Sequence, residues 1–122
     1  MNLIDTSPFY GLTRSESVLG EILAEEGLRQ KIYLCSKAGR NGNASFDFSP
    51  SAISKSVESS LTRLRTDYLD ILIAHDIEFA DDFEAVFTAT ANTLLQLKQA
   101  GKCRFIGMSG LPLSLLRTAC ER

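Results

Sequence analysis

Apolar and polar positions alternate in blocks along the chain, and the blocks predict four short strands, each followed by a helix. The apolar blocks consist mostly of isoleucine and leucine, which is typical of strands covered on both faces. We predict strands at residues 2–5, 31–37, 68–75 and 103–109. This alternation predicts an α/β fold in which right-handed βα units build a parallel sheet.

The first helix is predicted from the signals at its two ends. Thr13 and Glu16 have the spacing of a capping box, in which each side chain bonds the backbone of the other residue. Gly27 stands where a left-handed C-terminal cap is wanted. We therefore predict a helix over residues 14–26.

The later helices are predicted from apolar periodicity as well as from their ends. The second should begin at Ser49 and Pro50, a favoured cap followed by proline at the first helical position. Its apolar positions recur at steps of four, four and three, as one stripe: Ile53, Val57, Leu61 and Leu64. A third helix is predicted over residues 82–99, closed by Gly101, with one apolar side: Phe83, Val86, Phe87, Leu94 and Leu97. A last helix should follow the segment SGLP and continue to Arg122.

Two architectures fit this order of elements: a doubly wound sheet or part of a (β/α)8 barrel. The chain lacks both the GxGxxG motif of dinucleotide-binding sheets and the GxxxxGK[ST] motif of phosphate-binding loops. Instead, polar residues gather at the C-terminal ends of the predicted strands: Asp5, Lys37, His75 and Ser109. Because barrels carry their chemistry at those ends, we predict about half of a (β/α)8 TIM barrel.

Composition and charge narrow the classes of partner. The formal net charge is −2 without any run of like charge, so we expect neither nucleic acid nor an anionic membrane as a partner. No apolar run reaches about 18 residues, and Asp5 interrupts the N-terminal one, so we expect no membrane span and no signal peptide. The three cysteines are dispersed and the histidine is single, which predicts free thiols, no metal site and a reducing, cytoplasmic location.

Side-chain parity tests whether the strand-end residues share a face. Each of the three strand-end residues shares parity with apolar or aromatic residues of its own strand: Asp5 with Leu3, Lys37 with Tyr33 and Cys35, and His75 with Ile71 and Ile73. If that set points into the barrel, the three polar groups converge above one apolar floor. Tyr10 lies on the turn after the first strand and can fold over the same place.

This combination of groups suits proton transfer at a carbonyl or an alcohol. A tyrosine exchanges its proton poorly at neutral pH, but an adjacent lysine ammonium favours the phenolate form. A buried lysine keeps its charge only beside a partner such as the Asp5 carboxylate. His75 can offer a ring N–H to polarise a substrate carbonyl. Such a step also needs a hydride carrier, because no side chain supplies hydride.

Four segments resemble the successive strand-end motifs of the aldo-keto reductase superfamily: DTSPFYG, LCSKAGR, YLDILIAHD and KCRFIGMSG. The segments HDIEF and GLPL resemble its L-galactose dehydrogenase-like branch more than the classical aldose reductases. The resemblance covers essentially the whole chain and implies a (β/α)8 barrel. Residues 1–122 would then be its second to fifth βα units.

The resemblance also implies roles for individual residues. It implies a catalytic set, with Tyr10 as the acid-base group: Asp5, Tyr10, Lys37 and His75. It implies NAD or NADP as cofactor, contacted by Asp5 and by Ser109, whose family counterpart binds the nicotinamide carboxamide. The family has an asparagine after that serine, where this chain has Gly110. The implied activity is hydride transfer between the cofactor and a sugar or other aldehyde or alcohol, as in an aldose or L-galactose-type dehydrogenase.

A complete barrel takes about 250 residues, so we expect a partial chain. It would lack the last βα loops, which hold the adenosine and phosphates of the cofactor in the family, and would be inactive alone. The alternatives are a non-catalytic reductase-like binding subunit, a truncated relic, and a barrel enzyme that uses Lys37 as a Schiff-base amine. Exposed sheet edges at residues 2–5 and 103–109 predict self-association. We expect the following arginines at the surface or in ion pairs between units: Arg40, Arg63, Arg65 and Arg104.

Overall fold

A sheet of four parallel strands, in the order β1-β2-β3-β4, organises the chain. The computed structural model describes residues 2–25 and 27–121. The strands are β1 (Leu3–Asp5), β2 (Tyr33–Ala38), β3 (Leu69–Ala74) and β4 (Cys103–Met108). All four predicted strands are present, and the parallel order confirms the predicted βα organisation.

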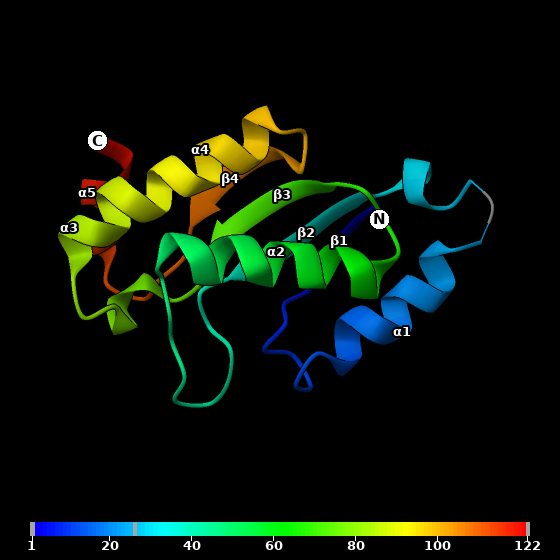
Figure 1. Cartoon of the computed structure of the whole chain (residues 1–122), viewed down its shortest axis with the longest axis horizontal. Helices are drawn as coiled ribbons and strands as arrows, with labels where there is room; N and C mark the ends of the chain where they lie inside the picture. The colour runs from blue at the N-terminus through cyan, green and yellow to red at the C-terminus, as the bar shows by residue number, and fades with distance from the viewer. Residues whose placement is uncertain (1, 26, 122) are drawn as a thin grey trace.

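The helices follow the strands in turn and pack against the sheet (Figure 1). They are α1 (Arg14–Leu23), α2 (Pro50–Leu64), α3 (Phe83–Ala85), α4 (Ala91–Gln99) and α5 (Leu113–Glu121). A π-helical turn at Val86–Thr90 joins α3 to α4, and short 3₁₀ turns lie at Arg29–Lys31 and Ile77–Phe79. Each strand is thus followed by helical structure, as the hydrophobic pattern predicts.

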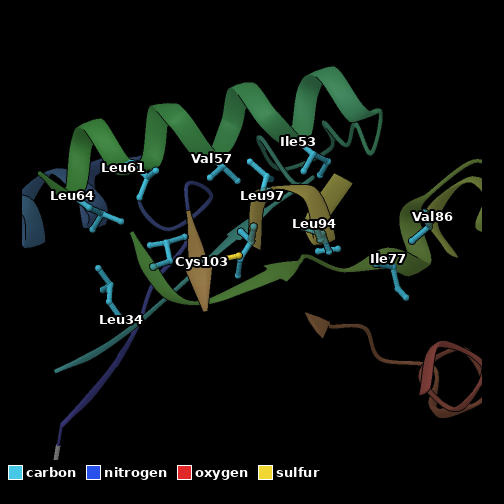
Figure 2. Close-up of a cluster of buried hydrophobic side chains, with 14 of the residues drawn as sticks. Leu34, Ile53, Val57, Leu61, Leu64, Ile77, Val86, Leu94, Leu97 and Cys103 are labelled. Atoms are coloured by element: carbon cyan, nitrogen blue, oxygen red, sulfur yellow. The ribbon is translucent and has the colours of Figure 1, made fainter. Parts of the chain in front are cut away.

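The core lies between the helices and one face of the sheet. The predicted stripe of α2 is buried along its whole length, and Ile53 and Leu64 are fully covered. Figure 2 shows this stripe pointing from α2 toward Leu34 of β2 and Cys103 of β4. Burying a leucine or isoleucine side chain contributes about 1.5–3 kcal/mol, so this stripe is a main source of fold stability.

The two faces of the sheet differ in exposure. Leu34 and Leu72 are fully buried on the helix side, whereas Tyr33 and Phe105 on the other face are 51% and 62% exposed. Cys35 pairs with Ile71, which pairs in turn with Phe105, so these side chains belong to that second face. Helices outside and an open inner face are the layout of about half of a (β/α)8 barrel.

The start of α1 differs from the predicted capping box. Thr13 has a left-handed backbone with φ of 74° and its side chain makes no cap hydrogen bond. Glu16 is fully buried instead, where it accepts hydrogen bonds from Ser36 Oγ at 2.6 Å and Arg63 Nε at 2.8 Å. The capping box is therefore wrong, because Glu16 bonds across to β2 and α2 rather than to its own helix end.

Other helix ends are partly as predicted. Ser49 caps α2, and its hydroxyl accepts the Ala52 N–H at 3.3 Å. Helix α1 ends at Leu23, before the predicted end at residue 26, which lies outside the described residues. Helix α5 is described to Glu121, so the predicted Arg122 also lies outside. The third predicted helix contains the π turn, and Phe83 on its supposed apolar side is 43% exposed.

Candidate functional site

Four of the predicted residues meet at the C-terminal ends of the strands, which we call the open edge of the sheet. The loops after β1 and β2 leave the sheet together at the lower edge in Figure 1. Asp5 ends β1, Lys37 is the last residue but one of β2, and His75 directly follows β3. Tyr10 lies in the turn between β1 and α1. We call these four residues the strand-end site.

Asp5 and Lys37 form an ion pair across β1 and β2. The Lys37 ammonium donates to Asp5 Oδ1 at 2.7 Å and to the Thr6 carbonyl oxygen at 2.8 Å. Strand register pairs Asp5 with Cys35, so Lys37 lies two positions past the end of β1 and reaches back to it. The Lys37 side chain is 7% exposed and that of Asp5 is 51% exposed. The ammonium is therefore buried, while the carboxylate that holds it also faces the open edge.

This pair keeps both groups charged. Burial lowers the pKa of Lys37, but hydrogen bonds and charge interactions with Asp5 and Tyr10 outweigh it, so the net pKa is raised. Burial raises the pKa of Asp5, but the Lys37 hydrogen bond, together with Cys35 and the positive charges nearby, lowers it overall. Burial and the neighbouring Asp5 raise the pKa of Cys35 to about 12, so this thiol stays protonated. The site thus holds a fixed ammonium at neutral pH.

Tyr10 sits on a turn whose backbone is strained. Gly11, Leu12 and Thr13 all have left-handed φ angles, of 60°, 50° and 74°. Glycine adopts this conformation freely, whereas a left-handed leucine or threonine costs about 1–2 kcal/mol each. The Thr13 N–H donates to the Pro8 carbonyl at 2.7 Å and closes the turn. Such strain persists only where surrounding contacts impose it, and it concentrates at functional sites.

The ring of Tyr10 contacts two other members of the site. The Lys37 Nζ atom lies 4.7 Å from the centroid of the Tyr10 ring, within the range of a cation–π interaction. The His75 ring meets it edge-on with centroids 6.1 Å apart. Tyr10 is 37% exposed, so the phenol is supported from within the protein and accessible from outside.

His75 is buried, and both of its ring nitrogens have protein neighbours. Its Nδ1 lies 3.3 Å from Ser7 Oγ, and its Nε2 lies 3.5 Å from Asp76 Oδ2. Its backbone N–H donates to the Ala38 carbonyl at 2.8 Å, which ties the end of β3 to β2. Burial lowers the pKa of His75, and the positive charges of Lys37 and Arg40 add to this against the opposing effect of the nearby carboxylates. The imidazole is therefore neutral at pH 7.

Ser109 lies at the same edge, directly after β4. Its hydroxyl oxygen accepts the Asp76 backbone N–H at 3.2 Å, which leaves its own proton available to a ligand. Its carbonyl accepts the Ile77 N–H at 2.9 Å, and its N–H donates to Ala74 at 2.9 Å. The loops after β3 and β4 are thus joined at Ser109.

A side chain at position 110, beside Ser109, would displace the Glu78 carboxylate. A Cβ atom at this position would lie 2.7 Å from Glu78 Oε2. Glu78 accepts the Leu111 N–H through Oε1 at 3.1 Å, and its Oε2 is buried without a hydrogen-bond partner among the described residues. The Glu78 carboxylate therefore takes the space that an asparagine side chain would need.

Several residues of this region were not identified from the sequence as part of the site. They hold the strand-end site by backbone or side-chain contacts: Thr6, Ser7, Arg40 and Asp76. Arg40 was expected at the surface or in an ion pair, and it pairs with Asp76 at 2.5 Å. No local pattern marks these residues, because each acts on a partner that is distant in sequence, such as Ser7 on His75.

The arrangement suits proton exchange with a small ligand at the edge of the sheet. A phenol, an ammonium and a neutral imidazole converge, and the open face beside them is apolar. Within residues 2–25 and 27–121, no three histidine, cysteine, aspartate or glutamate side chains are grouped to hold a metal ion. In the same part of the chain, no helix has the length and apolar character to cross a membrane.

Comparisons with known proteins place the chain in a family. The model of the Aldo/keto reductase family matches residues 1–122. The L-galactose dehydrogenase of Arabidopsis thaliana is 44% identical over 100% of this chain, and the D-arabinose 1-dehydrogenase of Saccharomyces cerevisiae is 36% identical over 99%. The chain spans 38% and 36% of the lengths of these two relatives.

Solved structures give the same result. The glycerol dehydrogenase of Gluconobacter oxydans superimposes with a TM-score of 0.80 at 32% identity, covering 99% of this chain and 38% of its own. An aldo-keto reductase from Klebsiella pneumoniae in complex with NADPH gives a TM-score of 0.77 at 30% identity, covering 100% of this chain and 38% of its own. These neighbours confirm the predicted fold class.

Proposed function

This chain belongs to the aldo/keto reductase family of oxidoreductases, and on that premise we propose that its strand-end site is catalytic. The proposed reaction interconverts a carbonyl and an alcohol on a small sugar or other aldehyde. One observation carries the proposal: the Lys37 ammonium, paired with Asp5 at 2.7 Å, lies against the ring of Tyr10 at 4.7 Å. A structural salt bridge alone does not require a half-exposed phenol at its side.

Tyr10 is the proposed general acid and base. In reduction its hydroxyl gives a proton to the substrate carbonyl oxygen, and in oxidation its phenolate takes the proton of the substrate hydroxyl. The Lys37 ammonium stabilises the phenolate formed in reduction, since opposite charges attract strongly away from bulk water. Asp5 keeps that ammonium charged and in place.

His75 is proposed to orient the substrate. A neutral imidazole with a proton on Nε2 can donate a hydrogen bond to the substrate oxygen without competing with Tyr10 as an acid. The rings of Tyr10 and His75 meet edge-on, with centroids 6.1 Å apart. This proximity supports the proposal that both groups act on the same substrate oxygen atom.

The proposed cofactor is NAD or NADP. When bound, a nicotinamide cofactor supplies or accepts the hydride that no side chain can provide. The residues present fit its nicotinamide end, because Ser109 retains a hydroxyl donor and Asp5 a half-exposed carboxylate acceptor at one edge. The neighbour from Klebsiella pneumoniae contains NADPH, which supports a nicotinamide cofactor without choosing between the two forms.

The proposed substrates are aldoses. By their names, the relatives above are an L-galactose dehydrogenase and a D-arabinose 1-dehydrogenase. We therefore propose an aldose or L-galactose-type dehydrogenase built on the second to fifth βα units of a barrel. The free thiols Cys35, Cys103 and Cys120 support a reducing, cytoplasmic location as part of this proposal.

The test is an assay of the purified chain, and of any longer product of the same reading frame, with NAD⁺ or NADP⁺. L-galactose and D-arabinose are supplied as substrates, and reduction of the cofactor is followed by absorbance. The proposal predicts substrate-dependent reduction of one cofactor. Binding of cofactor without turnover would support the alternative of a non-catalytic subunit, and failure of both would contradict a nicotinamide enzyme.

Self-association is a separate part of the proposal. Leu3, Tyr33 and Phe105 are each about half exposed or more on the inner face, and β1 and β4 are the two edges of the sheet. Exposed apolar faces and unpaired strand edges favour association with a second chain. Sedimentation of the purified chain should show dimers or larger species, and a stable monomer would contradict this part.

A further inference from the structure

His75 is the only histidine of the chain, and it stands between two polar neighbours. On one side is the Ser7 hydroxyl, and on the other is the carboxylate of Asp76. A carboxylate beside an imidazole normally draws a proton onto the ring and forms an ion pair with it. The question is what prevents Asp76 from doing so here.

Arg40 already occupies the carboxylate. Its guanidinium bonds Asp76 Oδ2 at 2.5 Å, whereas the distance from that same oxygen to His75 Nε2 is 3.5 Å. The first is a short, charge-assisted hydrogen bond, and the second is too long for a good one. The Asp76 carboxylate is therefore paired with Arg40 rather than with His75.

Aromatic side chains hold Arg40 in this position. Its guanidinium lies 3.6 Å from the centroid of the Phe9 ring and 5.4 Å from that of Phe46. Phe46 in turn stacks on Phe79 with centroids 4.6 Å apart. A lysine at this position would stack poorly on these rings, because the guanidinium of arginine is planar and more weakly hydrated than an ammonium group.

We propose that Arg40 is a positioning residue, which holds the Asp76 carboxylate in an ion pair of its own and so leaves His75 neutral. The Nε2–H of His75, which lies 3.5 Å from Asp76 Oδ2 and forms no good hydrogen bond with it, can then donate to a substrate oxygen, a consequence that rests on the proposed function. The state of His75 in the free protein does not depend on that function.

The polar neighbours of the two ring nitrogens indicate which nitrogen carries the proton. The Ser7 hydroxyl is fully buried and accepts the Phe9 N–H at 3.1 Å. Its own proton can then be donated to His75 Nδ1, which lies 3.3 Å away. Because the Asp76 carboxylate beside Nε2 can only accept, this arrangement favours the ring proton on Nε2, with Nδ1 as the acceptor.

The charged groups near His75 come from β1, from β2 and from the loops that follow β2 and β3. Lys37 and Arg40 contribute positive charge, while Asp5 and Asp76 contribute negative charge. Because Lys37 is paired with Asp5 and Arg40 with Asp76, the surroundings contain two compensated pairs rather than a free carboxylate. Burial then decides the outcome and lowers the pKa of His75. Removing Arg40 alone would leave Asp76 uncompensated.

The experiment is an NMR titration of the single histidine in the full chain, without cofactor or substrate. Arg40→Gln should raise the pH midpoint of His75, because Asp76 becomes free to pair with the imidazolium. Asp76→Asn should lower or preserve the midpoint, and the double variant should fall back from the value of Arg40→Gln. Asparagine is well tolerated at position 76, whose φ is 57°. Arg40→Lys, which keeps the charge, should lie between Arg40→Gln and the unaltered chain.

Arg117→Gln is the matched control, since Arg117 is exposed on α5 and its loss removes the same charge. It should leave the midpoint unchanged. An unchanged midpoint in a folded Arg40→Gln chain would overturn the proposal, as would ¹⁵N shifts that place the neutral ring proton on Nδ1. If Arg40→Gln does not fold, a rise of the midpoint in Asp76→Asn overturns it instead. A raised midpoint in Arg40→Gln with unchanged turnover would leave this inference standing and contradict only the substrate-orienting role of His75.

Discussion

The Lys37 ammonium and the Asp5 carboxylate are joined by a 2.7 Å hydrogen bond that spans the ends of two neighbouring strands. The pairing is asymmetric, because Lys37 is buried while Asp5 is half exposed. An arrangement of this kind keeps a cation at the mouth of a parallel sheet, where a lone lysine would tend to lose its proton. It is the structural basis for the role given to Tyr10.

Asp5→Asn should destabilise the chain by about 1 kcal/mol, because Lys37 loses a charged partner while water still reaches the open side of the pair. The pKa of Asp5 is lowered from 3.8, so its stabilising effect exists above that value and disappears as the pH falls through the lowered folded pKa. Urea unfolding at a series of pH values measures this. The gap between wild type and Asp5→Asn should close on acidification, whereas the exposed control Asp67→Asn should show little gap at any pH.

His75 should make the fold less stable as the pH falls below about 6.5. Its folded pKa is lowered from 6.5, so the unfolded chain binds the extra proton first and unfolding becomes more favourable as the pH decreases through that region. His75→Gln should flatten this part of the profile of unfolding free energy against pH. Because the chain has one histidine, an equally steep profile in the variant would assign the effect to another group.

Gly20→Ala should destabilise the chain by about 2 kcal/mol or more, through overpacking between α1 and α2. A Cβ atom at Gly20 would overlap the backbone carbonyl oxygen of Arg63, and backbone cannot move aside as a flexible side chain can. Thermal or urea unfolding gives the difference. The matched control is Gly107→Ala on β4, where no atom lies within 4 Å of the added Cβ. An equal loss in both variants would contradict close packing as the cause.

Gly110→Asn, which restores the asparagine expected from family resemblance, should cost about 1 kcal/mol by displacing the Glu78 carboxylate from the Leu111 N–H. Much of this cost should vanish when Glu78→Ala is already present, since the space is then free. A double-mutant cycle of unfolding free energies measures the coupling. Additive effects of the two substitutions would show that Glu78 does not fill the asparagine position.

Elements governed by local rules could be predicted from the sequence. Ser49 and Pro50 predict the start of α2, because the preferences for cap and first-turn residues depend on neighbouring residues alone. The strands follow from short apolar blocks, and parity placed Asp5 and Lys37 on the inner side of the sheet. The convergence of the strand-end site is a consequence of parallel pairing, which brings the C-terminal ends of strands to one edge.

Features that depend on distant partners were missed or misinterpreted. Glu16 has the spacing of a capping residue, yet it is drawn into the core by Ser36 and Arg63, which are far away in sequence. The π turn before α4 interrupts a helix that periodicity alone describes as regular. No local sequence pattern indicates that Arg40 and Asp76 act on His75, because their positions depend on the packing of the loop after β2 against the loop after β3.

The most direct test of the account is the turnover of Tyr10→Phe compared with Tyr33→Phe in a chain that reduces a nicotinamide cofactor. Both changes remove one phenolic hydroxyl, but Tyr33 begins β2, at the opposite end of the strands from the site. We predict that Tyr10→Phe lowers kcat by about 10²- to 10⁴-fold with cofactor binding retained, the range expected for loss of a general acid. Tyr33→Phe should turn over like the unaltered chain. Wild-type turnover in Tyr10→Phe would contradict the proposal that this phenol transfers the proton.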